Sequence, residues 1–184
     1  MIGGRLIVAT MVASVVLCTD AGMEAARARQ EAGQLREVFP DASDFSLKAG
    51  DLPYFEAFRT DPQTGRRVLA GFVFYTTDLE PLERGYTGPI KILVGMTIEG
   101  TLTGSKMIEN REPFGYFTID TSGFHDQFTG KSVFDQFEVG QDIDAVSGAT
   151  VTVASATRSI RLGVRRIARQ YLLDYSFRPA PTTP

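Results

Sequence analysis

The sequence predicts a single α+β domain in which an antiparallel sheet is packed by helices. Three observations lead to this prediction. The chain has 184 residues, 43% of them hydrophobic, which suffices for one core but not comfortably for two. Apolar segments of strand length follow one another between residues 68 and 108. A long segment with helical periodicity, residues 149–171, comes after them and can cover the sheet.

The first 21 residues are expected to be a signal peptide or an N-terminal membrane anchor. Arg5 precedes an apolar run from Leu6 to Cys18, which is short for a membrane span and suits the core of a signal peptide. Thr19-Asp20-Ala21 provides a small-residue cleavage site, whereas a buried N-terminal helix is the alternative interpretation. Export or anchoring would place the rest of the chain outside the cytoplasm, in the periplasm or another extracytoplasmic compartment.

The predicted domain comprises residues 23–175. Its first half begins with a helix and continues into strands. Residues 23–39 are rich in Ala, Glu, Arg and Gln, and Pro40 closes this helix. Residues 41–66 are interrupted by prolines and a glycine, so that one short strand surrounded by turns fits best. The apolar segments at 68–76, 90–98 and 102–108 predict an antiparallel meander, with a hairpin turn at Glu99-Gly100.

The second half of the domain is expected to contain two helices. Residues 121–128 can form a short helix that ends near Gly130. Residues 149–171 form the long helix, with one apolar face and a second face lined by arginines. The apolar positions are Val153, Ala156, Ile160, Val164, Ile167 and Tyr171, and the arginines are Arg158, Arg161, Arg165 and Arg169. Residues 176–184 are proline-rich and are expected to be a disordered tail.

Composition excludes several classes of function. The net charge of −3 argues against nucleic acid as the main partner, because phosphate neutralisation needs an excess of basic residues. With Cys18 and His125 as the only cysteine and histidine, zinc clusters, iron–sulfur ligation and internal disulfides lack ligands. A redox cofactor would therefore be organic or held by oxygen ligands. His125 itself is expected to be a surface or capping residue of the short helix, without a partner.

The segment Ser147-Gly148-Ala149-Thr150 lies immediately before the long helix and is the strongest candidate site. A helix start presents unpaired backbone N–H groups and the positive end of the helix dipole, so a phosphate is favoured there. Gly148 and Ala149 allow close approach of a bulky ligand. The alternative is that Ser147 or Thr150 is an ordinary N-cap, the common role of hydroxyl residues at helix starts.

Three sequence elements resemble the FMN-binding domain family, which includes the RnfG and NqrC subunits of ion-pumping redox complexes. The first, from Asp144 to Thr150, is similar to the flavinylation motif of that family. The second, Arg111-Glu112-Pro113-Phe114-Gly115, is similar to its Glu-Thr-Pro-Gly-like turn, and the third, Phe128-Thr129-Gly130-Lys131-Ser132, to its Phe-x-Gly-Lys-Ser element. The resemblance implies the FMN-binding domain fold and FMN attached covalently, as a phosphoester of Thr150, by an FAD-dependent flavin transferase that uses magnesium.

A narrower resemblance connects the chain to the periplasmic flavin domain of NosR/NirI-type proteins. It is carried by Gly85-Tyr86-Thr87-Gly88-Pro89-Ile90, by residues 111–117 and by residues 142–147. Those proteins continue into membrane helices and ferredoxin-like cysteine motifs, which this sequence does not contain. The flavinylation motif is intact here, because Gly148 and Thr150 are both present.

The resemblance assigns expected roles to further residues. Glu112, Pro113 and Gly115 would lie near the flavin ring, and Lys131 would neutralise a phosphate oxygen or remain a solvated surface lysine. Asp144 would bind the magnesium ion or orient the Thr150 hydroxyl, and the alternative for Asp144 is a turn aspartate that bonds local N–H groups. Phe114, Tyr116 and Phe117 would contact the ring or belong to the core.

The expected function is electron transfer by a tethered flavin between a membrane-associated respiratory or denitrification-type redox system and its partner proteins. The alternative is a non-catalytic sensor or maturation module that assists an exported reductase. A hydrolase with Ser147 or Thr150 as nucleophile is disfavoured, because no base is evident beside them. Whether the chain is an enzyme in its own right is left open by the sequence.

Overall fold

The computed structural model describes residues 4–79, 82–85, 87–109, 111 and 123–172, with side chains from residue 21 onward. The elements are α1 (Gly4–Val38), β1 (Asp44–Phe45), β2 (Phe55–Thr60), β3 (Arg67–Tyr75), η1 (Thr76–Asp78), β4 (Lys91–Thr97), β5 (Leu102–Glu109), η2 (His125–Phe128) and α3 (Thr150–Tyr171). The strands form one five-stranded sheet in the order β1-β2-β3-β4-β5, and every neighbouring pair is antiparallel. The α+β class and the meander are thus confirmed.

The strands lie close to their expected positions. β3, β4 and β5 begin and end within one residue of the predicted segments. The turn between β4 and β5 is closed by a backbone bond of 3.0 Å from the Gly100 N–H to the Thr97 carbonyl, and Gly100 has φ +85°. Between residues 41 and 66 the structure has the expected strand, β2, and adds the two-residue β1 at the sheet edge.

The expected helix at residues 121–128 is wrong in type. Within the described residues, this region contains only the single 3-10 turn η2, which begins at His125. Gly123 has φ +69° and Gly130 has φ +80°, values that interrupt a regular right-handed helix on both sides of η2. One short turn is what fits between them.

The helix predicted at residues 23–39 belongs to the longer α1, which ends at Val38, two residues before Pro40. The chain divides into two compact units, one up to Gln34 and one from Leu35 onward. Among the residues whose side chains the structure describes, no helix is long and apolar enough to cross a membrane. The signal peptide or anchor at residues 1–21, the domain limits 23–175 and the tail 176–184 remain predictions, and the tail lies outside the described residues.

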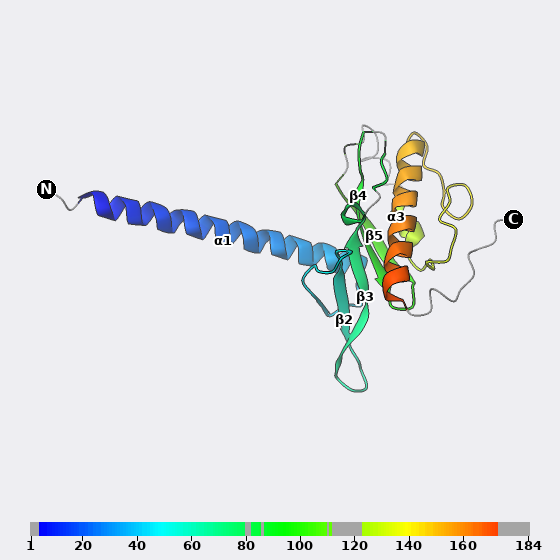
Figure 1. Ribbon diagram of the computed structural model, residues 1–184, viewed down its shortest axis with the longest axis horizontal. Helices are drawn as coiled ribbons and strands as arrows, with labels where there is room; N and C mark the ends of the chain where they lie inside the picture. Colours follow the sequence, from blue (N-terminus) through cyan, green and yellow to red (C-terminus); the bar gives the residue numbers. More distant parts are fainter. Residues whose placement is uncertain (1–3, 80–81, 86, 110, 112–122, 173–184) are drawn as a thin grey trace. The chain divides into compact units, whose positions relative to one another are not determined.

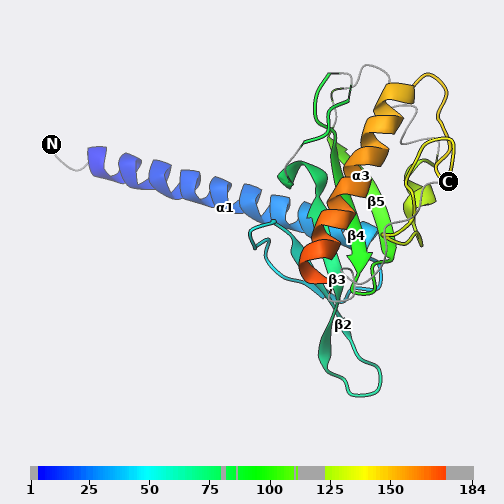
Figure 2. The ribbon, with the colours of Figure 1, turned by 45° about the vertical axis from the view of Figure 1, so that its right-hand side comes forward.

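The face of the sheet that α3 covers holds the larger core (Figures 1 and 2). Successive strand residues point to opposite faces, and on this face Phe72, Phe74 and Val94 meet the apolar side of α3. Five of the six predicted apolar positions of the helix are fully buried there: Val153, Ala156, Ile160, Val164 and Ile167. Burial of each large side chain stabilises the fold by about 1.5–3 kcal/mol, so this core fixes α3 on the sheet.

The opposite face of the sheet holds a second core, formed with the last turn of α1. Leu35, Val38 and Phe39 pack there with Val73 and Leu93, among others. The helix end approaches the backbone of the strands closely, because Gly95 and Gly104 face each other across β4 and β5 without side chains. The Thr103 hydroxyl donates a hydrogen bond of 2.6 Å to the Val38 carbonyl, which satisfies one of the free carbonyls at the helix end.

The connection from η2 to α3 is irregular but anchored to the hairpin turn between β4 and β5. Leu102 exchanges two backbone bonds of 2.8 Å with Gly130 and Lys131. The Val133 N–H donates to the Gly100 carbonyl, also at 2.8 Å. These bonds fix the start of the connection to the sheet. The connection then leads to the first residue of α3.

Candidate functional site at the start of the long helix

The residues before α3 form a tight turn that only glycine fits without strain. The Ala149 N–H donates to the Val146 carbonyl at 3.1 Å, and Gly148, the third residue of this turn, has φ +81°. A positive φ at the third position is what a type II turn requires and what a side chain disfavours. Gly148 therefore sets the angle at which the chain enters α3.

The helix starts without a side-chain cap. Ala149 is the N-cap residue, and its carbonyl accepts the first helical bond from Val153 at 2.8 Å, but its methyl group cannot cap an N–H group. The alternative in which Ser147 or Thr150 caps the helix is therefore wrong. Thr150 is instead the first helical residue and is exposed, as is Ser147.

This helix start suits a phosphate group. The first N–H groups of a helix have no intrahelical acceptor, and here the N-cap residue Ala149 has no side-chain acceptor to offer them. The first turn of α3 contains no acidic residue, so no negative charge competes for the positive end of the helix dipole. The exposed Thr150 hydroxyl adds a group that can be esterified, next to N–H groups of a kind that bind phosphate.

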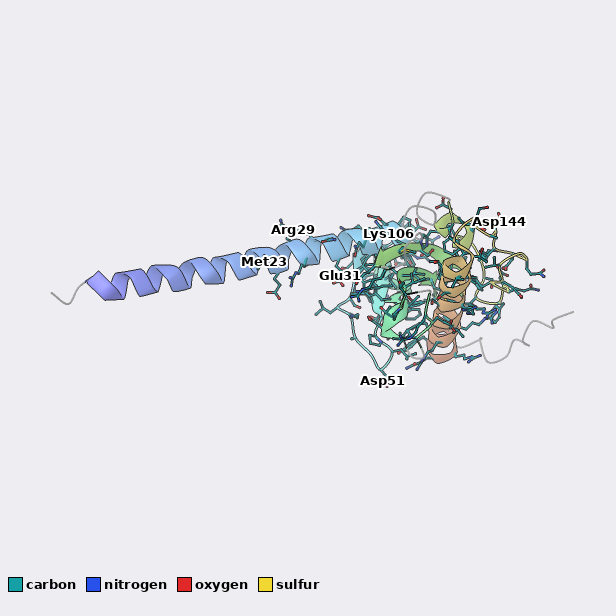
Figure 3. The ribbon with its side chains drawn as sticks, turned by 90° about the horizontal axis from the view of Figure 1, so that it is seen from above. Met23, Arg29, Glu31, Asp51, Lys106 and Asp144 are labelled. Carbon is teal, nitrogen blue, oxygen red and sulfur yellow. The ribbon has the colours of Figure 1, made fainter. Side chains whose placement is uncertain are left out.

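Asp144 lies on the connection before the helix, with its carboxylate exposed at the outer edge (Figure 3). Its backbone N–H donates to the Gln127 side-chain oxygen at 2.7 Å, which ties this part of the connection to η2. Its carboxylate has no hydrogen-bond or ion-pair partner among the described residues. Asp144 is thus held through its backbone, and its carboxylate faces solvent.

Lys131 and Asp142 form a half-buried ion pair, 3.3 Å between Nζ and Oδ2. Asp142 also accepts the N–H groups of Glu138 at 2.7 Å and Phe137 at 3.1 Å. Partial burial by itself would raise the pKa of Asp142, but these two N–H groups and the Lys131 ammonium outweigh it and hold the pKa below its ordinary value. Lys131 therefore stabilises the turn at residues 137–142.

The loop before β4 lies at the same end of the domain as the start of α3 (Figures 1 and 2). In this loop, the Thr87 hydroxyl donates a bond of 2.6 Å to the carbonyl of Arg111, which follows β5 in the sequence. Glu83 pairs with Arg158 of α3 at 3.0 Å. Glu112, Pro113 and Gly115, together with Phe114, Tyr116 and Phe117, lie outside the described residues, so their predicted places near a flavin ring stay predictions.

His125 is the residue that the sequence interpretation placed wrongly. It is not an unpartnered surface residue: its Nδ1 atom lies 2.8 Å from the Ser105 Oγ atom, and its Nε2 atom is buried. Gln127 and Asp142 were missed as structural residues of the site. Their roles depend on bonds to the backbone of residues 137, 138 and 144, and no local sequence signal reveals such bonds.

Comparisons with known proteins identify a family model and several relatives that this chain resembles. The profile of the FMN-binding domain family matches residues 85–164. The G subunit of the Na⁺-translocating ferredoxin:NAD⁺ oxidoreductase complex of Acetobacterium woodii is 28% identical over 146 residues, which are 71% of this chain and 70% of that protein. The G subunit of an ion-translocating oxidoreductase complex of Methanosarcina acetivorans is 25% identical over 174 residues, 89% of each chain. Its counterpart in Vibrio atlanticus is 32% identical over 93 residues, 45% of this chain and 44% of that one.

These relatives are G subunits of ion-translocating oxidoreductases, so the narrower resemblance to NosR/NirI-type proteins is not supported. The matched segment includes β4, β5, η2, the connection that follows and most of α3. The turn at Gly148 and the exposed Thr150 hydroxyl both lie inside it. The similarity to the FMN-binding domain family thus covers residues 85–164 of the chain.

Proposed function

We propose that this chain is an extracytoplasmic flavoprotein component of a membrane-associated, ion-translocating oxidoreductase complex, in which it carries FMN as a phosphoester of Thr150. The family match supports FMN as the cofactor. The relatives, which are G subunits of ion-translocating oxidoreductase complexes, support the complex. FMN, when bound, supplies one- and two-electron transfer, and the chain provides its attachment and surroundings.

The observation that carries the proposal is the free helix start at Thr150. A capped helix would use its hydroxyl internally, whereas the N-cap here is Ala149 and the Thr150 hydroxyl is exposed. The helix dipole stabilises a phosphate by about 0.3–1 kcal/mol, and direct bonds from the N–H groups add to this. The same position is thus open to the transferase before attachment and favourable to the phosphoester afterwards.

The neighbouring residues would divide the remaining tasks. Ser147, Gly148 and Ala149 would form the turn against which the phosphate lies. Asp144 would bind the magnesium ion or orient the Thr150 hydroxyl during attachment, since its exposed carboxylate is an oxygen ligand of the kind that magnesium prefers. Glu112, Pro113 and Gly115 would contact the ring. Lys131 would support a phosphate oxygen only if its bond to Asp142 is shared or exchanged.

The attachment step would leave the chemistry to the transferase. The Thr150 hydroxyl would lose its proton and form a new bond to the phosphorus of the FMN half of FAD, and AMP would leave. A hydroxyl needs a base or a metal ion for such a step near neutral pH. Asp144 and the magnesium ion of the transferase are the groups that we expect to provide it.

The test is the intact mass of the full chain after co-expression with a flavin transferase. Wild type should gain the mass of one FMN less one water, and Thr150→Val should gain nothing, because it lacks the hydroxyl. Ser147→Ala is the matched control, since it removes the other exposed hydroxyl of the turn and should keep the adduct. Flavin absorbance should survive acid precipitation in wild type and in this control but not in Thr150→Val.

Two results would contradict the proposal. An FMN adduct on Thr150→Val would place the attachment elsewhere. Wild type that gains no flavin while a known substrate of the same transferase is modified would refute covalent attachment and favour the flavin-free sensor or maturation module.

A further inference from the structure

The outward side of α3 concentrates positive charge in a chain that is acidic overall. The helix has 22 residues, of which five are arginines and none is acidic, while the whole chain has a net charge of −3. We define the arginine face as Arg158, Arg161, Leu162, Arg166 and Arg169. A charged helix face is common, so its surroundings decide whether it has a function.

Most of the arginine face has no ion pair with the described residues. Four other basic side chains form ion pairs: Lys48 with Asp78, Arg67 with Asp44, Lys106 with Glu37 and Lys131 with Asp142. On the arginine face, only Arg158 does so, with Glu83. For Arg161, Arg166 and Arg169, the described residues provide no carboxylate within the ion-pair distance. This face therefore keeps a local excess of positive charge.

An exposed leucine lies in the middle of these charges. Leu162 is 41% exposed, and Arg158 and Arg166 are its helical neighbours four positions before and after it. Arg165, three positions later, is fixed by a bond of 2.8 Å to the Asp135 carbonyl. An apolar centre within a polar, arginine-rich rim is the composition typical of protein–protein interfaces.

Two grooves flank the arginine face. One, of about 330 Å³, is lined by Leu79, Glu83 and Ser159 and by Leu162, Arg166 and Arg169. The other, of about 300 Å³, is lined by Phe137, Glu138 and Thr157 and by Arg158 and Arg161. Side chains of a partner can enter such grooves on both sides of the helix. The partner would then hold α3 between these side chains.

From this arrangement we infer that the arginine face is the surface by which the chain docks onto an acidic protein, namely a carboxylate-rich surface of another subunit of the same complex. The inference rests on the proposed function, because it takes the complex as given. Arginine, and not lysine, supplies every basic residue of α3, and the planar guanidinium pairs with carboxylates in a directional way. Grooves and a central leucine match a shaped protein partner better than a fluid lipid surface.

The test compares two charge-reversal variants of the full chain in the organism that encodes it. Arg166→Glu/Arg169→Glu changes the arginine face, and Arg59→Glu/Arg66→Glu is the control, with the same change of charge at exposed positions of β2 and the turn after it. The tagged chain is purified from membranes in mild detergent, the other subunits are quantified by mass spectrometry, and FMN is measured by intact mass. We expect the first variant to retain roughly tenfold less of the other subunits, because juxtaposed like charges oppose association.

The outcomes separate this inference from the proposed function. Loss of subunits in Arg166→Glu/Arg169→Glu, with FMN attached and the control unchanged, supports docking through the arginine face. Equal retention in wild type and both variants overturns the inference and leaves the proposed function intact. Wild type that carries FMN but retains no other subunit overturns membership of the complex and the inference with it.

A lipid role is tested separately with the same full-length proteins. Flotation with vesicles of phosphatidylcholine alone and of phosphatidylcholine mixed with phosphatidylglycerol compares neutral and anionic membranes. If Arg166→Glu/Arg169→Glu loses binding only to the anionic vesicles while subunit retention is unchanged, the arginine face binds lipid and the inference is wrong. Leu162→Ser provides a second check, because a protein interface should lose subunits with it, whereas purely electrostatic attraction to lipid should not change.

Discussion

The Nδ1 atom of His125 lies 2.8 Å from the Oγ atom of Ser105, and this contact joins η2 to the edge strand β5. Burial lowers the pKa of His125 from its ordinary value of 6.5 to about 4, and the nearby Asp126 carboxylate offsets this only in part. The imidazole is therefore neutral in the folded protein near neutral pH. Its Nε2 atom is buried and has no hydrogen-bond partner among the described residues.

Acid should destabilise the fold through His125. Because the pKa is lower in the folded state, the unfolded chain takes up the proton first as the pH falls. The free energy of unfolding should then decline between about pH 6.5 and about pH 4. The contribution of His125 to this decline totals about 3 kcal/mol and ends below about pH 4. Urea unfolding across this range measures the loss. His125→Gln should lack this part of the slope, and an unchanged slope in the variant would assign the acid sensitivity to other groups.

Asp142 should stabilise the connection before α3 as a carboxylate. It accepts two backbone N–H groups and pairs with Lys131, and Phe137, one of the donors, has the unfavourable φ of +50° for a residue with a side chain. Asp142→Ala should cost about 2–3 kcal/mol in the free energy of unfolding, because it leaves donors unpaired. Asp144→Ala is the control and should cost little, since its exposed carboxylate has no described partner.

Asp142 also predicts a loss of stability as the pH falls, but in a lower pH range than His125. The pKa of Asp142 is lower in the folded protein than its ordinary value of 3.8. Its stabilisation is therefore complete above that value and is lost as the pH falls through the folded pKa. In urea unfolding at acid pH, wild type and Asp142→Asn should converge below about pH 3.8 and differ most near neutral pH; parallel curves would count against the carboxylate.

Gly148→Ala should strongly reduce the fraction of the chain that carries FMN, while it lowers the free energy of unfolding only modestly. The added methyl group meets no atom within 4 Å, so the cost comes from φ +81°, about 1–2 kcal/mol for a residue with a side chain. Relief of that strain would shift the turn that presents Thr150. Gly140→Ala is a matched control, with φ +87° and equally open space, and should lose similar stability but keep full FMN mass. Equal flavin attachment in both variants would show that the turn is not required.

The regular elements could be predicted because their burial is periodic, whereas the connection between them could not. β3 to β5 and α3 bury residues at the spacing of strand and helix, so the pattern of apolar residues revealed them. The connection at 129–149 has no such period. Its shape depends on the Asp142 carboxylate and on pairing with Gly100 and Leu102, which lie far earlier in the chain. Residues 147–150 do lie at the start of the long helix, as the sequence predicts, but Ala149 at the N-cap position runs against the usual preference for hydroxyl residues.

The paired glycines of β4 and β5 run against the sequence preferences of strands. Glycine weakens a strand interior, yet Gly95 and Gly104 pair across β4 and β5 where the end of α1 packs. A methyl group on Gly95 would overlap the Val38 carbonyl and the Thr103 hydroxyl, which are bonded to each other. Gly95→Ala should therefore lower the free energy of unfolding by about 1–3 kcal/mol, the usual cost of overpacking. Gly88→Ala, in the loop before β4, has no positive φ and no atom within 4 Å of the added methyl group, so it controls for the methyl group alone. If both variants lose the same stability in urea, close packing of the helix end on Gly95 does not hold the second core together.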